Sequence, residues 1–102
     1  AYRAAIVADS DFLPGGSAGG ANPCLDCATR PCLAACPAGA AGEPFLLTAC
    51  SDERLRPGSP CARSCLARLA CPVGSAHRYD DAQLSHSYGQ SLAMLESWRR
   101  QR

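Results

Sequence analysis

Eight cysteines, gathered in two runs with one isolated cysteine between them, are the residues of this chain best suited to chemistry. They are Cys24, Cys27, Cys32, Cys36, Cys50, Cys61, Cys65 and Cys71. Thiolates are soft metal ligands, and a [4Fe–4S] cluster is held by four of them. Eight cysteines are therefore the right number for two such clusters, and the pattern predicts that metal-bound sulfur carries the chemistry of this chain.

The two runs form a degenerate internal repeat. Both end in Cys-Pro-x-Gly, at residues 36–39 and 71–74, and both contain Cys-Leu-Ala, beginning at Cys32 and Cys65. The second copy carries two more residues between its cysteines. A duplicated pattern of this kind predicts a pseudo-symmetric domain with one metal site near each half.

Length and composition agree with a metal-supported domain. The 102 residues suffice for one small domain, and the apolar fraction of 47% is mostly Ala and Cys, with one Ile, two Val, two Phe and one Trp. Such a chain buries little large apolar surface, so metal or disulfide support is expected. The net charge of +1 argues against nucleic acid as a main partner.

Three other interpretations of the cysteines stay open. A disulfide framework would use all eight in four bridges, although no secretory signal accompanies them. Two four-cysteine zinc sites would use them as well, but zinc ribbons usually combine two Cys-x-x-Cys pairs, and only Cys24 and Cys27 form one here. Cys50 could be a buried core cysteine, which would leave one cluster a ligand short.

The first half of the chain predicts few regular elements. Residues 1–9 are expected to end a helix that begins upstream, and the Gly-rich residues 10–23 to form a loop or linker. A short helix is expected around residues 32–36. The apolar residues 45–47 predict a short strand or extended segment, and the polar residues 51–60 a loop with a Pro-Gly turn.

The second half predicts more helix. Residues 61–71 are expected to be helical with Leu66 and Leu69 facing inward, and residues 74–79 to form a loop. Asp80 or Asp81 is a plausible N-cap for a helix that runs to about Arg100. The residues expected on or near its inner face are Leu84, Tyr88, Leu92, Leu95 and Trp98.

We therefore expect three parts. Residues 1–21 are the helix end and linker, residues 22–79 hold the cysteines, and residues 80–102 are the C-terminal helix. No stretch approaches the ~18 apolar residues of a membrane span. The absence of a visible secretory signal makes the cytoplasm the expected location.

The spacings Cys24-x2-Cys27-x4-Cys32-x3-Cys36-Pro and Cys61-x3-Cys65-x5-Cys71-Pro resemble those of bacterial-type two-cluster [4Fe–4S] ferredoxins. The closest layout is the ferredoxin-like domain of epoxyqueuosine reductases and reductive dehalogenases, in which an isolated cysteine also lies between the runs and electrons pass to a bound cobalamin. The resemblance covers about residues 22–76. The spacings before Cys32 and before Cys71 are longer than is usual in these families.

This resemblance implies a small, irregular α+β ferredoxin-like fold with two [4Fe–4S] clusters and crossed ligation, because the Cys-Pro cysteine of each run serves the other cluster. The first cluster would take Cys24, Cys27, Cys32 and Cys71. The second would take Cys36, Cys50, Cys61 and Cys65. The protein would then be an electron carrier rather than an enzyme, a ferredoxin or a relay domain that serves a redox protein or a cofactor-bearing enzyme. The runner-up function is a structural or interaction module held by zinc or another purely structural metal.

The remaining polar residues predict less chemistry. His77 and His86 are possible ligands, but eight cysteines already suffice, so we expect both on the surface. Four arginines lie near the second run, where they could offset cluster charge, face an acidic partner or simply form a solvated face: Arg54, Arg56, Arg63 and Arg68. No nucleophile and base share a motif, which argues against catalysis within this chain.

Overall fold

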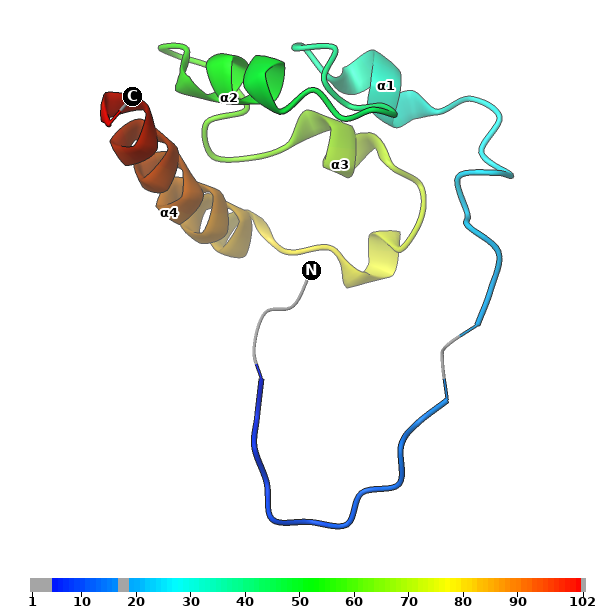
Figure 1. Cartoon of the computed structure of the whole chain (residues 1–102). Helices are drawn as coiled ribbons and strands as arrows, with labels where there is room; N and C mark the ends of the chain where they lie inside the picture. Colours follow the sequence, from blue (N-terminus) through cyan, green and yellow to red (C-terminus); the bar gives the residue numbers. More distant parts are fainter. Residues whose placement is uncertain (1–4, 17–18, 102) are drawn as a thin grey trace.

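A computed structural model describes residues 5–16 and 19–101 of the chain (Figure 1). An extended N-terminal segment leads into a group of short helices, and the longest helix closes the chain. The helices are α1 (Pro31–Ala35), α2 (Leu47–Leu55), α3 (Leu66–Ala70), the 3-10 turn η1 (Ser75–His77) and α4 (Asp81–Arg100). None of the helices in the described part of the chain is both long enough and apolar enough to cross a bilayer.

The described residues contain helices and loops but no strand, so the predicted α+β class is wrong, and the structure is that of a small helical protein. The strand expected at residues 45–47 does not form. The Leu46 amide donates to the Ala40 carbonyl at 3.1 Å, which closes a local turn, and Leu47 already begins α2. An apolar run this short does not by itself distinguish a strand from the entry to a helix.

The helix predicted over residues 1–9 is absent where the structure describes it. Residues 5–9 are non-helical, and residues 1–4 lie outside the described range. Ile6 and Val7 are 90% and 100% exposed, so no packing supports a helix there. Short helices without tertiary contacts are marginal in water, which explains the extended path of residues 5–16 in Figure 1.

The internal repeat is visible as two matching helix ends. Both α1 and α3 are five residues long and end at a Cys-Pro-x-Gly turn, with the cysteine as an extended C-cap. The turn glycines, Gly39 and Gly74, have φ of +59° and +67°. Left-handed backbone at these points favours glycine, because a Cβ would be strained there. The two helices pack against each other, and Ala67 of α3 is buried.

The repeat is unequal at the start of its helices. Cys32 lies inside α1, whereas α3 begins only after Cys65, which is its extended N-cap. The helix predicted over residues 61–71 is therefore shorter than expected. Turns precede it, since the Cys61 amide donates to Ser59 Oγ at 3.1 Å and the Ala62 amide donates to the Ser59 carbonyl at 3.2 Å. The two extra residues of the second copy thus place Cys65 outside its helix.

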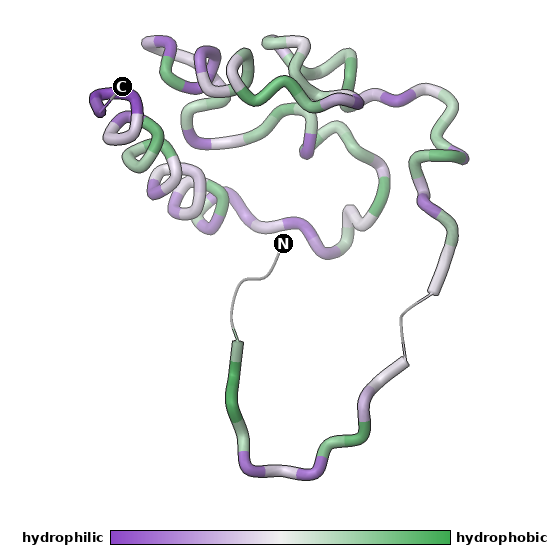
Figure 2. Tube along the Cα trace, in the orientation of Figure 1, coloured by the Kyte–Doolittle hydropathy of each residue, from purple (hydrophilic) through white to green (hydrophobic). Residues whose placement is uncertain are grey.

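Helix α4 begins as predicted. Asp80 is its N-cap, and the Asp80 carboxylate accepts a hydrogen bond from the Gln83 amide at 2.8 Å. Leu84 is buried, and the residues that follow it on the same face are half-buried, namely Tyr88, Ser91, Leu92 and Leu95. Other residues of α4 are exposed, among them the apolar Met94, and Figure 2 shows hydrophilic and hydrophobic residues mixed along this helix.

Helix α2 was not predicted, because its central residues are polar and were expected to form a loop. It packs against α4, and an ion pair between Asp52 and Arg99 joins the two helices. Tertiary contact therefore overrides the local pattern here.

The apolar core is very small. Among the described residues only Ala40, Ala67 and Leu84 are buried apolar side chains, whereas Phe45, Leu46 and other large apolar residues stay exposed. Three such residues bury too little surface to hold 102 residues together. The fold therefore needs a support other than its apolar packing.

Candidate metal centre

Four of the predicted ligands, Cys36, Cys50, Cys61 and Cys65, line one cavity of about 280 Å³. They come from three segments that are distant in sequence: the end of α1, the first half of α2 and the turns before α3. The same four were grouped in the sequence analysis as ligands of the second cluster. All are free thiols.

Charge interactions reflect the same grouping. Burial raises the pKa of the Cys50 thiol, the Arg54 guanidinium opposes this rise, and repulsion from the other three thiolates adds to it. Burial also raises the pKa of the Cys61 thiol, where repulsion from the thiolates of Cys65 and Cys36 again contributes. Four thiolates this close repel one another, so a cationic centre between them would favour all four ionised forms at once.

The Cys36 sulfur is surrounded by backbone donors. The Ala40 amide donates to Cys36 Sγ at 3.4 Å, and the left-handed conformation of Gly39 turns the chain back over the sulfur. Burial alone would raise the pKa of the Cys36 thiol, but hydrogen bonds from the amides of residues 38–41 outweigh it and lower the pKa below its ordinary value. The Cys-Pro-x-Gly turn therefore stabilises a thiolate at this position.

Two further predicted ligands have polar neighbours of their own. The backbone amide of Leu66, at the start of α3, lowers the pKa of the Cys61 thiol against the larger effect of burial. Tyr88, on α4, lines the same cavity as Cys65. Donors that face sulfur stabilise the charged ligand, and hydrogen bonds to sulfur are among the factors that set the potential of an iron–sulfur centre.

Hydrogen bonds from Arg54 link the segment that carries Cys61 to α2 and α4. It lies on α2 one turn after Cys50, and its Nε and Nη2 donate to the carbonyls of Cys61 and Ala62 at 3.3 and 3.4 Å. Nη2 also donates to the Tyr88 carbonyl and to Ser91 Oγ on α4, each at 2.9 Å. One partly buried guanidinium thus joins three parts of the chain beside the thiols.

The four thiols line a cavity rather than converging on a point. No group of His, Cys, Asp or Glu side chains in residues 5–16 and 19–101 is arranged to hold a single metal ion. Tetrahedral zinc with bonds of ~2.3 Å would place its sulfurs only ~3.8 Å apart. A cubane cluster, which has iron and sulfide at its corners, holds its four thiolates farther apart. Four thiolates around one cavity are the donor set that a cubane cluster uses.

The other four predicted ligands are placed differently. Cys24 and Cys27 lie in an exposed turn closed by a hydrogen bond from the Cys27 amide to the Cys24 carbonyl at 3.4 Å. Cys32 lies in α1 and Cys71 at the end of α3, two helices that pack together. Cys24, Cys27 and Cys32 line neither the four-thiol cavity nor the hollow beside Cys71, so the first cluster stays a prediction.

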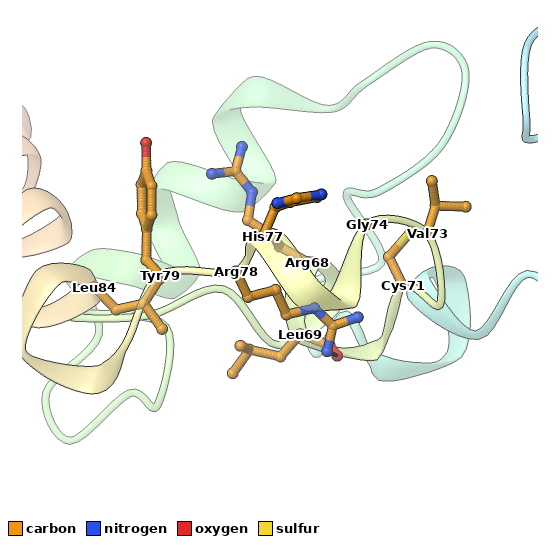
Figure 3. Close-up of a pocket in the computed structure, with 9 residues that line it drawn as sticks. All are labelled: Arg68, Leu69, Cys71, Val73, Gly74, His77, Arg78, Tyr79 and Leu84. Atoms are coloured by element: carbon orange, nitrogen blue, oxygen red, sulfur yellow. Dashed lines mark hydrogen bonds between the residues drawn. The ribbon is translucent and has the colours of Figure 1, made fainter.

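Cys71 borders a separate hollow of about 320 Å³ (Figure 3). Its lining combines apolar side chains with the basic residues Arg68, His77 and Arg78. Arg78 Nη1 donates to the Leu69 carbonyl at 2.6 Å and so links the loop after Cys71 to α3. His77 is exposed here, and His86 is exposed on α4.

Tyr88 and Arg54 were not predicted as parts of a site. Tyr88 was expected only on the inner face of the last helix, and Arg54 only as a nearby charge. One signal was available in the sequence, because Arg54 follows Cys50 by four residues and so shares its face on any helix. No comparable spacing links Tyr88 to Cys65.

Comparison with protein-family models, with curated proteins and with solved structures gave no match.

Proposed function

We propose that this protein is an electron carrier that binds two [4Fe–4S] clusters through its eight cysteines, acting as a ferredoxin or as the relay domain of a larger redox system. One observation supports the proposal above all. Cys36, from the first run, lines the same cavity as Cys50, Cys61 and Cys65. This is the crossed arrangement that two-cluster ferredoxins use.

The environment of these thiols supports the proposal further. The Ala40 amide donates to Cys36 Sγ, Tyr88 lines the cavity with Cys65, and Arg54 provides a positive charge beside Cys50. An iron–sulfur cluster bound there would supply one-electron chemistry without proton or group transfer. The chain's own contribution is to hold the thiolates ionised, to cover them partly from water and to present the centre to a redox partner.

The small core gives the cofactor a second role. Ligation of the two sets of cysteines would connect segments from Cys24 to Cys71, which apolar packing alone connects poorly. Metal-binding free energy would then be a large part of the folding free energy, as in other small metal-bound domains.

Metal and sulfide analysis of anaerobically purified protein tests the proposal. We expect close to eight iron and eight acid-labile sulfide per chain, because eight thiolates serve two clusters at four each. Four of each would mean that only one cluster forms. Zinc without sulfide, or a colourless protein with four disulfides, would refute the proposal and favour a structural module.

Serine variants test the partition of the ligands. Cys36→Ser and Cys65→Ser should damage the same centre, whereas Cys71→Ser should damage the other one. Iron content and the electron paramagnetic resonance spectrum of the reduced protein distinguish the two losses. The crossed arrangement is wrong if Cys36→Ser and Cys71→Ser remove the same signal.

A further inference from the structure

Tyr88 belongs to the four-thiol site although it lies on α4, which carries none of the four cysteines. It lines the cavity together with them, and Cys65 is among the groups that raise the pKa of the Tyr88 hydroxyl, after burial. Cys65 itself lies in extended backbone just before α3. The cavity therefore brings the C-terminal helix beside one predicted ligand.

Contacts with Arg54 and Ser91 hold Tyr88 in place. The Arg54 guanidinium lies over it, with Cζ 5.2 Å from the ring centroid, a cation–π geometry. Arg54 also donates to the Tyr88 carbonyl at 2.9 Å, and Ser91 Oγ donates to the same carbonyl at 3.0 Å. Backbone and ring of Tyr88 are thus both fixed, which leaves the hydroxyl little freedom to turn away from the sulfur.

A phenol oxygen facing a thiolate acts as the donor, because the thiolate has no proton to give. The bond withdraws electron density from the sulfur and stabilises negative charge on it. Since reduction adds one negative charge to a cluster, a donor on a ligand sulfur favours the reduced form.

Resting on the proposed function, we propose that Tyr88 is a positioning and tuning residue for the cluster held by Cys36, Cys50, Cys61 and Cys65. Its hydroxyl donates to Cys65 Sγ and raises the reduction potential of that centre alone. The C-terminal helix is thereby part of the redox site, and a partner that moves α4 would alter the electron affinity of one cluster.

The test is a redox titration of the cluster-loaded Tyr88→Phe variant, followed by electron paramagnetic resonance. Phenylalanine keeps the ring under Arg54 and removes only the hydroxyl. The loss of one hydrogen bond should lower the one-electron equilibrium constant of one centre about two- to tenfold. A tenfold change corresponds to ~59 mV for a one-electron couple. The other centre should not change.

Tyr79→Phe is the matched control. Tyr79 also loses a hydroxyl, but it lines the hollow beside Cys71 rather than the four-thiol cavity. We expect both potentials of this variant to equal those of the wild type. Equal potentials in Tyr88→Phe and Tyr79→Phe would overturn the proposal, and so would a shift of both centres in Tyr88→Phe.

Two measurements distinguish a failure of the Tyr88 proposal from a failure of the proposed function and from poor cluster loading of the variant. Wild-type protein without iron and sulfide would refute the proposed function, whereas loaded wild type with an unshifted Tyr88→Phe would refute only the role of Tyr88. If the variant loads poorly, resonance Raman spectra of its loaded fraction still report the Fe–Sγ stretches. We expect one stretch to rise in frequency when the hydroxyl donor is lost, and an unchanged spectrum would overturn the proposal.

Discussion

Substitution of Arg54 tests how a chain with so small an apolar core keeps its cysteine-bearing segments together. The variant Arg54→Gln keeps a polar side chain but cannot reach all of the acceptors on the Cys61 segment and on α4. Two of the four bonds of Arg54 are short, at 2.9 Å, and two are longer, at 3.3 and 3.4 Å. The lower value for a hydrogen bond to a charged group, ~1.5 kcal/mol, applied only to the two short bonds, gives a loss of about 3 kcal/mol.

That loss is large beside the ~5–15 kcal/mol that stabilises an ordinary domain. With a guanidinium m-value of ~3 kcal/mol/M, the unfolding midpoint of the variant should fall by about 1 M. Anaerobic denaturation, followed together by visible absorbance and near-UV circular dichroism, measures the shift. The two signals should be lost together, because Arg54 bonds both to the segment that carries Cys61 and to α4.

Arg56→Gln is the control for this experiment. Arg56 lies two residues further on, and its half-exposed side chain forms an ion pair with Glu53 within the same helix turn, so we expect a much smaller fall in its midpoint. Equal midpoints for the two variants would show that the Arg54 bonds do not stabilise the fold. A lower midpoint for Arg54→Gln with unchanged cluster absorbance would show that Arg54 acts on α4 but not on the site.

Three smaller perturbations probe other parts of the structure. Gly39→Ala should lower the unfolding free energy by ~1–2 kcal/mol in the same denaturation assay, because the φ of Gly39 is +59°. Gly42→Ala is the control and should be nearly neutral, because the added Cβ would meet only a side chain at 3.9 Å. In cluster-free protein, Cys36 should be alkylated faster than Cys50 near neutral pH, because the pKa of the Cys36 thiol is lowered and that of the Cys50 thiol is raised. Mass spectrometry of timed samples measures the order, and the reverse order would contradict this prediction. Asp80→Ala should cost α4 ~1 kcal/mol, seen as lost far-UV helical signal on heating, and an unchanged melting curve would contradict the capping role.

Local signals in the sequence were enough for α4 and for the Cys-Pro-x-Gly turns. Asp80 caps the last helix as expected, and Leu84 begins its inner face, because a cap and a helical period are both visible without tertiary information. Gly39 and Gly74 similarly mark left-handed positions. Patterns of this kind depend only on backbone sterics and on spacing along one element.

The features that the sequence predicted wrongly or did not predict all depend on packing between elements. Residues 5–9 have helical propensity but nothing to pack against, and the polar residues of α2 become helical only beside α4. Within the site, the grouping of Cys36 with three later cysteines followed from a known ligation rule. The placement of Tyr88 beside Cys65 did not, because it relates a residue of α4 to one in the extended backbone before α3, and no local pattern specifies that relation.

The unequal halves of the repeat have a consequence for the direction of electron flow. Cys32 is part of a helix, whereas Cys65 precedes one and lines a cavity with Tyr88. In the proposed two-cluster protein, a perfect duplication would give two centres of equal energy, between which an electron has no preference. The two extra residues in one half would remove that equivalence. The electron would then reside mainly on one centre and reach it through the other.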